Sequence, residues 1–366
     1  MRGADSRFAG LSGRGVRERY VARPEVSGVV TRSRKEFLVG AGGLLLFASY
    51  GCGGGGGEGA SGQRGVIEHK HGSTEIPEAP ERIVTVGLTD QDPVLALGVT
   101  PVGTTEWFGE EPGAIFPWAR DYVEGETPEV VGDAESINFE SVAALEPDLI
   151  LGLYSGLSSQ QYETLSEIAP VIAQPGEYAD YGVPWQEQTR RIGRALGREE
   201  RADELIAQTE GRFEEAREQN PRFEGASGVV ASFQPGYYYV YGPQDSRGRF
   251  MRSLGFEIPG EIAELAGDDF GAEISRERLD IVDADALVWL VNSEEDGEEL
   301  RQDSLYGQLE ASREERDLFL INGGPLYDAF SFSSVLSLPF LLDEIAPDLA
   351  AAVDGDPATR VETTTG

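Results

Sequence analysis

Two glutamates stand at equivalent places in two similar segments of the chain. Glu140 follows Asn138 by two residues, Glu277 follows Ser275 by the same spacing, and each pair precedes an apolar-stepped stretch and a strand-like run. Asn and Ser side chains can accept hydrogen bonds from free N–H groups at a helix start, and a carboxylate in the first turn interacts favourably with the helix dipole. The spacing therefore predicts two capped helices, and stabilising them is one role open to the glutamates.

These segments belong to a longer alternation of strand-like and helix-like stretches. Short apolar runs separated by helical patterns are typical of parallel strands with crossover helices. The runs lie at residues 82–87, 130–131, 149–151, 171–172, 229–233, 239–241, 286–291 and 318–321. A Leu-Gly pair followed closely by proline occurs both at 97–101 and at 254–259. The sequence thus predicts an α/β protein with two similar, Rossmann-like lobes.

One long helix is predicted to join the lobes. The stretch from Glu199 to Asn220 places apolar side chains on one face, and Pro221 ends it. Its length would be about 30 Å at 1.5 Å per residue. A final helix is expected around 334–346, interrupted by Pro339. We expect an N-terminal lobe at 77–183, a helical connector at 184–222, a C-terminal lobe at 223–354, a tail at 355–366, and a ligand cleft between the lobes.

The chain is strongly acidic. Its 366 residues include 65 acidic and 30 basic side chains, which gives a net charge of -35. A nucleic-acid partner is disfavoured, because neutralising phosphates requires Lys and Arg gathered on one face. Such a charge bears mainly on solubility and salt tolerance, and it says little about a small ligand.

The N-terminal region has the features of an export signal. Residues 32–52 contain a basic start, an apolar run too short to span a membrane comfortably, and small residues before Cys52, the only cysteine. Residues 33–38 resemble a twin-arginine signal with Lys35 in place of the second arginine, and residues 49–52 resemble a bacterial lipoprotein box with Ser49 in place of leucine. We expect 1–52 to be an export signal with a lipidation site, an incidental thiol being the alternative, and 53–76 to be a flexible Gly-rich tether.

Metal chemistry by protein side chains has little support in the sequence. His69 and His71 are the only histidines and fall in the expected tether, where solvation or an adventitious metal site would be their roles. A site with three histidines cannot be built, and one cysteine allows neither an intramolecular disulfide nor a cysteine cluster. We expect no protein-bound metal and no cofactor.

The ordered set of motifs resembles a known family. The matching pieces are "RIVTVG", "LALGVTPVG", "INFESVAALEPDLIL", "LSEIAP", "GRALGREERADELI", "SLGF", "ISRERLDIVDADALV" and "SLPFLLDEIAP". They resemble bacterial ABC-transporter substrate-binding proteins of the iron-siderophore, haem and cobalamin receptor class. The resemblance implies a rigid interlobe helix, a cleft that closes only slightly, and a monomeric, lipid-anchored receptor on the outer face of the cytoplasmic membrane. It also implies delivery to an ABC permease and its ATPase.

The resemblance assigns a second role to the paired glutamates. Members of this class carry one exposed glutamate on each lobe that pairs with permease arginines, and Glu140 and Glu277 match these positions. Docking is therefore expected, with helix capping as a compatible secondary role.

Candidate ligand-binding residues lie in the loops that follow the expected strands. Aromatic rings could pack on the organic shell of a chelate, and the Arg247 guanidinium could donate hydrogen bonds to metal-bound oxygens. Core packing is the alternative for the rings, and a surface salt bridge for Arg247. The aromatic candidates are Trp107, Phe108, Tyr154, Tyr178, Tyr181, Tyr237, Tyr238 and Tyr327. A ferric siderophore is the expected ligand, with haem (through a tyrosine) or a cobalamin as alternatives, and Arg247 alone permits a neutral hydroxamate or an anionic catecholate chelate.

Two other classes of protein were weighed. An exported hydrolase could use paired carboxylates, but the sequence has no nucleophile elbow, P-loop or dinucleotide fingerprint. A structural or adhesive lipoprotein would explain export but not two similar lobes with a bracing helix. A binding protein without enzymatic activity is the expectation.

Overall fold

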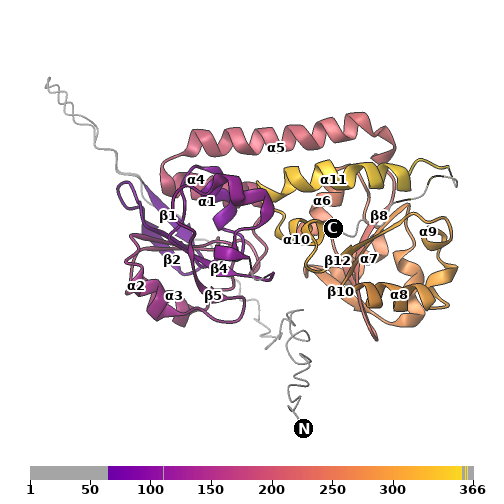
Figure 1. Cartoon of the computed structure of the whole chain (residues 1–366), viewed down its shortest axis with the longest axis horizontal. Coiled ribbons are helices and arrows are strands. Elements are labelled where there is room, and N and C mark those ends of the chain that lie inside the picture. Colours follow the sequence, from indigo (N-terminus) through magenta and orange to yellow (C-terminus); the bar gives the residue numbers. More distant parts are fainter. Residues whose placement is uncertain (1–64, 110, 357–358, 360, 362–366) are drawn as a thin grey trace, which may run out of the picture. The chain divides into compact units, whose positions relative to one another are not determined.

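Two five-stranded sheets organise the residues that the computed structural model describes, which are 65–109, 111–356, 359 and 361 (Figure 1). All of these residues belong to one compact unit. The expected export signal, the lipidation site Cys52 and most of the expected tether lie outside the described residues.

The N-terminal lobe contains a fully parallel sheet with strand order β5-β4-β3-β6-β7. Its central strands are buried on both faces, which explains their continuous apolar runs. Strand β4 has the sequence GTTE and was not predicted; its buried threonines donate hydrogen bonds to backbone carbonyls. The elements are β3 (Ile83–Thr85), α1 (Gln91–Ala96), β4 (Gly103–Glu106), η1 (Pro112–Ala114), η2 (Pro117–Tyr122), β5 (Glu129–Asp133), α2 (Phe139–Ala144), β6 (Leu149–Gly152), α3 (Ser159–Ser166) and β7 (Val171–Ala173).

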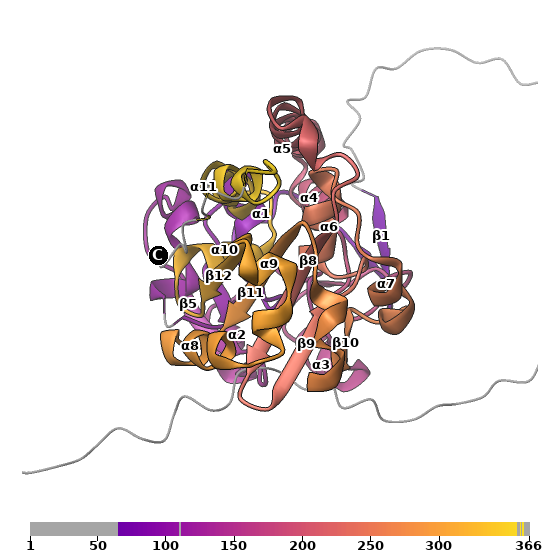
Figure 2. The ribbon, with the colours of Figure 1, turned by 90° about the vertical axis from the view of Figure 1, so that its right-hand side faces the viewer.

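The C-terminal lobe contains a mixed sheet with strand order β10-β9-β8-β11-β12, whose strands lie side by side in Figure 2. Strands β8, β11 and β12 are parallel, whereas β9 pairs antiparallel with both β8 and β10. Its elements are β8 (Gly228–Gln234), β9 (Tyr237–Tyr241), α6 (Ser246–Ser253), α7 (Gly260–Ala266), β10 (Gly271–Ile274), η4 (Arg276–Val282), β11 (Ala286–Val291), α8 (Glu294–Gln302), η5 (Tyr306–Gln308), α9 (Glu310–Arg313), β12 (Asp317–Ile321) and α10 (Pro325–Phe332).

Helices connect the lobes. α4 (Trp185–Leu196) leads into α5 (Glu199–Gln219), the predicted interlobe helix, whose expected apolar face is buried before η3 (Pro221–Phe223) ends it. The final helix, α11 (Ser337–Ala352), runs beside α5 and is longer than predicted (Figure 1). Pro339 does not interrupt it, because a proline in the first turn removes no intrahelical hydrogen bond.

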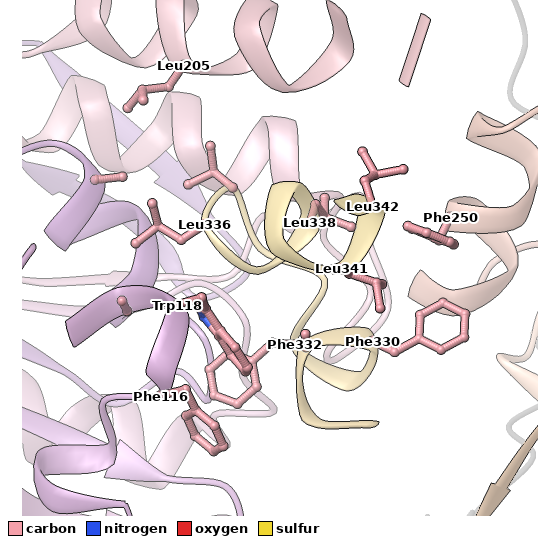
Figure 3. Packing of buried hydrophobic residues seen from close by; sticks show 14 of the residues in the cluster. Phe116, Trp118, Leu205, Phe250, Phe330, Phe332, Leu336, Leu338, Leu341 and Leu342 are labelled. Atoms are coloured by element: carbon pink, nitrogen blue, oxygen red, sulfur yellow. The ribbon is translucent and has the colours of Figure 1, made fainter. Parts of the chain in front are cut away.

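The two lobes share one apolar core at their junction. Phe332, which follows β12 in the chain, places its ring 4.5 Å from that of Phe116 and 5.3 Å from that of Trp118, both from the N-terminal lobe. Figure 3 shows this ring against its two neighbours, with Leu336 and Leu338 close by. Edge-to-face and tilted ring pairs of this kind stabilise a junction beyond simple area burial.

A β-hairpin replaces the last part of the expected tether. Strands β1 (Val66–His69) and β2 (Gly72–Glu75) pair antiparallel, so the tether prediction is wrong from residue 66 onward. The Thr74 hydroxyl donates to the Val171 carbonyl at 2.6 Å, which fastens the hairpin to β7.

The histidines belong to this hairpin and make defined contacts, so the expectation that they are only solvated is wrong. His69 is buried and its Nε2 lies 2.9 Å from the Thr74 hydroxyl, while His71 Nε2 lies 2.8 Å from the Leu157 carbonyl. The rings of both lie against Tyr162, at 5.2 and 4.9 Å. This packing could not be predicted from the sequence, because polar side chains do not indicate burial.

Candidate binding site between the lobes

Tyr154 is the N-terminal lobe's central contribution to the region between the lobes. It follows β6, and Asp90 holds the loop there by accepting hydrogen bonds from the backbone N–H groups of Leu153 at 2.7 Å and Tyr154 at 3.0 Å. Its ring lies 6.1 Å from that of Trp107 and 6.0 Å from that of Tyr181. Burial raises the pKa of Tyr154 to about 12, so the hydroxyl keeps its proton and can donate a hydrogen bond.

Arg247 is the corresponding group of the C-terminal lobe. Its side chain is only 11% exposed. The Nη1 atom donates to Asp245 Oδ1 at 3.1 Å, Nη2 donates to the Ser331 hydroxyl at 3.1 Å, and Cζ lies 4.5 Å from the centre of the Tyr241 ring. Asp245 also caps α6 by accepting from the Arg247 backbone N–H at 2.9 Å. The cluster is a buried ion pair, in contrast to the surface salt bridge that was its alternative.

The charge of Arg247 is fixed by its neighbours. Burial alone would lower the pKa of this guanidinium, but Asp245 and the nearby tyrosines outweigh burial and raise it. The Nε–H group is buried and has no hydrogen-bond partner among the described residues. An unpaired buried donor costs free energy, and a ligand oxygen reaching it would remove that cost.

Contacts between the lobes bring these two groups into one region. Arg249, on the helix that carries Arg247, donates from Nη2 to the Gly182 carbonyl of the N-terminal lobe at 3.0 Å. Tyr154 lies close enough to Asp245, Arg247 and Arg249 for all three charges to influence its pKa. A pocket here is lined by both lobes, including Tyr154, Ser246, Arg249, Trp185 and Phe332.

Most of the sequence-predicted aromatic residues border this region. The rings of Trp107 and Phe108 lie 4.9 Å apart, and each is 5.7 Å from Phe332. Tyr327 and Tyr178 are near enough to Arg247 and Arg249, respectively, to affect the pKa values of these arginines. Phe108 is also part of the shared apolar core, through Phe116.

Tyr237 and Tyr238 cannot act together, because successive strand residues face opposite ways. Tyr238 is 5% exposed, its ring lies 5.1 Å from that of Phe233, and its hydroxyl donates to Asp303 at 3.0 Å. It therefore points away from Arg247, and its prediction as a ligand residue is corrected. Tyr237 shares its face of β9 with Tyr239 and, through it, with Tyr241.

Sequence reasoning missed several residues of the region: Tyr239, Tyr241, Asp245, Arg249 and Ser331. Strand alternation in "YYYVY" could have found the two tyrosines, and the helix start in "DSRGRF" could have found Asp245 as a cap. Ser331 and Gly182 could not be found, because they come close to α6 only through the tertiary fold.

The paired glutamates differ in their local structure. Asn138 caps α2 as predicted, its Oδ1 accepting from the Ser141 N–H at 3.1 Å. Glu277 instead lies in the first turn of the 3₁₀-helix η4, which begins at Arg276, and Ser275 makes no capping bond, so the second half of the capping prediction is wrong. The backbone N–H of Glu277 and then the Ser275 hydroxyl lower the pKa of the Glu277 carboxyl.

Both glutamates are exposed. Among the described residues, no arginine or lysine nitrogen lies within 4.0 Å of either carboxylate. Each therefore presents a solvated negative charge from the start of a short helix, at matching places in the two lobes.

Among the described residues, no group of three or more His, Cys, Asp and Glu side chains is placed to hold a metal ion. Within the same residues, no helix combines the length and apolar character that crossing a membrane requires.

Known proteins share this fold and sequence pattern. The chain is 34% identical to a solved periplasmic solute binding protein from Mycobacterium smegmatis, with a TM-score of 0.71 over 79% of this chain and 98% of that one. It is 27% identical to Streptococcus pneumoniae PiaA, solved in complex with ferrichrome, with a TM-score of 0.70 over the same shares. It is also 26% identical to YfiY of Bacillus subtilis, named as a probable siderophore-binding lipoprotein, over 64% of this chain and 71% of that one. The periplasmic binding protein pattern matches residues 83–319, and the chain belongs to this family.

Proposed function

We propose that the protein is an extracytoplasmic receptor that captures an iron(III)-siderophore chelate between its lobes and delivers it to an ABC permease. The observation that carries this proposal is the Tyr154–Arg247 region, where both lobes contribute aromatic rings and a guanidinium. Its relatives include a protein named for siderophore binding and one solved with ferrichrome. The same arrangement suits this cargo, because rings can cover an organic shell while N–H donors meet the oxygens around the metal.

Glu140 and Glu277 are the proposed docking groups. Solvated rim charges steer and orient encounters more than they add affinity, so two matching carboxylates would align the receptor on a permease that presents arginines. The permease, driven by its ATPase, would then take the chelate from the interlobe region.

The proposed location is the outer face of the cytoplasmic membrane. Export through the signal in residues 1–52 and lipidation at Cys52 would anchor the receptor as a monomer. YfiY, one of the similar proteins, is itself named as a lipoprotein.

Ligand binding tests the first part of the proposal. The chain from Gly53 onward retains every described residue and can be titrated with ferric hydroxamate and catecholate siderophores, ferric citrate, haem and cobalamin while its tryptophan and tyrosine fluorescence is recorded. We expect saturable quenching by an iron chelate that is weakened at least tenfold in Arg247→Ala and unchanged in Arg252→Ala, an exposed residue of the same helix. Flat titrations with every chelate would contradict the proposal.

Uptake tests the second part. The double variant Glu140→Ala, Glu277→Ala should bind the chelate with unchanged affinity yet fail to support its transport. Glu163→Ala, Glu294→Ala removes two exposed glutamates from other helices of the same lobes and serves as the matched control. Normal uptake by the first variant would exclude these glutamates as docking groups.

A further inference from the structure

The two arginines of α6 that reach the site differ in how their charges are balanced. Arg247 faces both oxygens of Asp245, with Nη1 at 3.1 and 3.3 Å, so that pair is close to neutral. Arg249 donates to the Gly182 carbonyl at 3.0 Å, and among the described residues no carboxylate oxygen lies within 4.0 Å of its nitrogens. A carbonyl accepts a hydrogen bond but does not cancel a charge, so Arg249 keeps a positive charge that has no ion-pair partner in the described part of the chain.

Asp90 accepts hydrogen bonds from N–H groups beneath Tyr154, and other acidic side chains around the region are paired or partly protonated. Glu111 pairs with Arg120 at 2.6 Å, and Asp180 pairs with Lys70 at 2.5 Å. Asp328, near Tyr327, is buried, and burial raises its pKa to about 7, so near neutral pH it carries only part of a charge. Asp245 is near enough to influence Arg249, but its ion pair is with Arg247.

The position of Arg249 suits contact with a ligand. It lines a small pocket of about 30 Å³ between the lobes, together with Tyr154 and Ser246. Burial is the main cause that lowers the pKa of Arg249, which means that water solvates this guanidinium incompletely. An anion that binds the Arg249 guanidinium would therefore stabilise a charge that water solvates only in part.

The unpaired charge of Arg249 matters because the whole chain carries -35. The long-range field of such a protein repels anions, so a site that accepts one needs a local cation. A guanidinium presents parallel N–H groups that match the two oxygens of a carboxylate, a geometry that a neutral hydroxamate surface does not offer.

We propose that Arg249 is the residue that sets ligand class, and that the chelate carried by this receptor is anionic and presents carboxylate oxygens. This inference rests on the proposed function, since it concerns the same interlobe region. Arg249 would exchange part of its bond with Gly182 for a carboxylate of the chelate, while Arg247 stays with Asp245 and shapes the wall beside it.

The test compares ferric citrate, ferrichrome as a neutral hydroxamate chelate, and a ferric catecholate, each titrated into the chain from Gly53 onward. We expect ferric citrate to bind at least tenfold more tightly than ferrichrome, and its affinity to weaken with added salt. Arg249→Gln should lower the affinity for ferric citrate by about tenfold to a hundredfold and flatten the salt dependence. Arg249→Lys keeps the charge but loses the paired N–H groups, so its affinity for ferric citrate should lie between those of the unchanged protein and Arg249→Gln. Arg252→Gln should bind ferric citrate as tightly as the unchanged protein.

Any result other than the expected one contradicts a specific part of the inference. Tighter binding of ferrichrome, unaffected by Arg249→Gln, would overturn it and leave the receptor function in place. Tightest binding of the catecholate would overturn the carboxylate class. An equal loss for both ferric citrate and ferrichrome in Arg249→Gln, with a lowered unfolding temperature, would show that the residue only holds the lobes together. Failure of all three chelates to bind would remove the proposed function itself.

Discussion

The two lobes have the same strand order, and their sheets differ in the direction of one strand. In each sheet the first strand lies at the centre, with two later strands on either side, as β5-β4-β3-β6-β7 and β10-β9-β8-β11-β12. The N-terminal lobe leaves β3 through a loop into α1. The C-terminal lobe turns directly from β8 into the antiparallel β9 and only then enters α6, after which Glu257 returns to pair with Ser227, just before β8.

This difference separates two kinds of function. The antiparallel β9, which takes the place of β4 in the other sheet, and the turn after it supply Tyr239, Tyr241 and Asp245 and precede Arg247 and Arg249 on α6. The features common to both lobes supply Glu140 and Glu277. The proposed ligand contacts of the C-terminal lobe therefore lie in the segment where the lobes differ, and the proposed permease contacts lie where they are alike.

The largest expected effect tests whether the two lobes unfold independently of each other. Phe332→Ala should lower the free energy of unfolding by about 3–5 kcal/mol, because the ring belongs to the C-terminal lobe but packs among N-terminal rings. Denaturant unfolding monitored by fluorescence should show both lobes losing stability together. Tyr122→Ala, at an exposed ring, is the control, and a loss below about 1 kcal/mol for Phe332→Ala would argue for two separate cores.

Buried carboxylates give the next contrast. Asp328 in the C-terminal lobe has a buried Oδ1 without a partner among the described residues, and burial raises its pKa from 3.8 to about 7. The folded protein thus holds this proton more tightly than the unfolded one, so stability falls as pH rises from about 4 to 7. Asp328→Asn should raise stability at pH 8 by about 1–3 kcal/mol and change it little at pH 4, as urea unfolding at both pH values can measure.

Asp90 in the N-terminal lobe should respond in the opposite direction. Its oxygens accept from the Leu153 and Tyr154 backbone N–H groups and from Gln188 Nε2 at 2.7 Å. An amide at this position would turn N–H groups toward donors, so Asp90→Asn should lower stability by about 1–3 kcal/mol. Equal effects of the two substitutions would show that burial alone, rather than hydrogen bonding, distinguishes these carboxylates.

The β1–β2 hairpin, found on the N-terminal lobe, should open in acid. The Thr74 hydroxyl donates to Val171, so His69 donates from Nε2 to Thr74 while its Nδ1 accepts from the His71 N–H at 3.3 Å. A proton on His69 Nδ1 would remove this acceptor and place two donors, Nδ1–H and the His71 N–H, against each other.

Burial, followed by His71 and Arg191, lowers the pKa of His69 below 6.5, so its contribution is complete above pH 6.5 and is lost as pH falls. Hydrogen exchange at residues 66–75 should quicken between pH 7 and pH 5, by the equivalent of about 1 kcal/mol, relative to β11. His69→Gln should remove this pH dependence. Equal quickening of exchange in the unchanged protein and in His69→Gln would show that His69 is not the group responsible.

The smallest effect separates the two glutamate-bearing helices. Asn138→Ala should cost about 1 kcal/mol because it removes the α2 cap, whereas Ser275→Ala should cost less than about 0.5 kcal/mol because Ser275 does not cap η4. Equal losses in thermal unfolding would mean that the two segments are capped alike after all.

The sequence predicts what depends on local pattern and misses what depends on distant neighbours. The α5 helix and the buried strands follow from apolar spacing and from Pro221. Strand β4 and the hairpin were missed because their inward residues are threonine and histidine, which become buried only when other strands supply hydrogen-bond acceptors. Arg247 could be selected from its sequence, but that Arg249 has no carboxylate beside it among the residues the structure describes becomes visible only when the lobes are assembled.

The junction at Phe332 and Ser334 also bears on the order in which the protein can be made. The Ser334 hydroxyl donates to Asp92 of α1, and Phe332, Leu336 and Leu338 complete the apolar cluster that contains Phe116 and Trp118. A chain emerging from its N-terminus exposes these partners for most of its synthesis. The first lobe made therefore cannot finish folding until nearly the last residues have appeared, so that maturation of the two lobes is a single, late event.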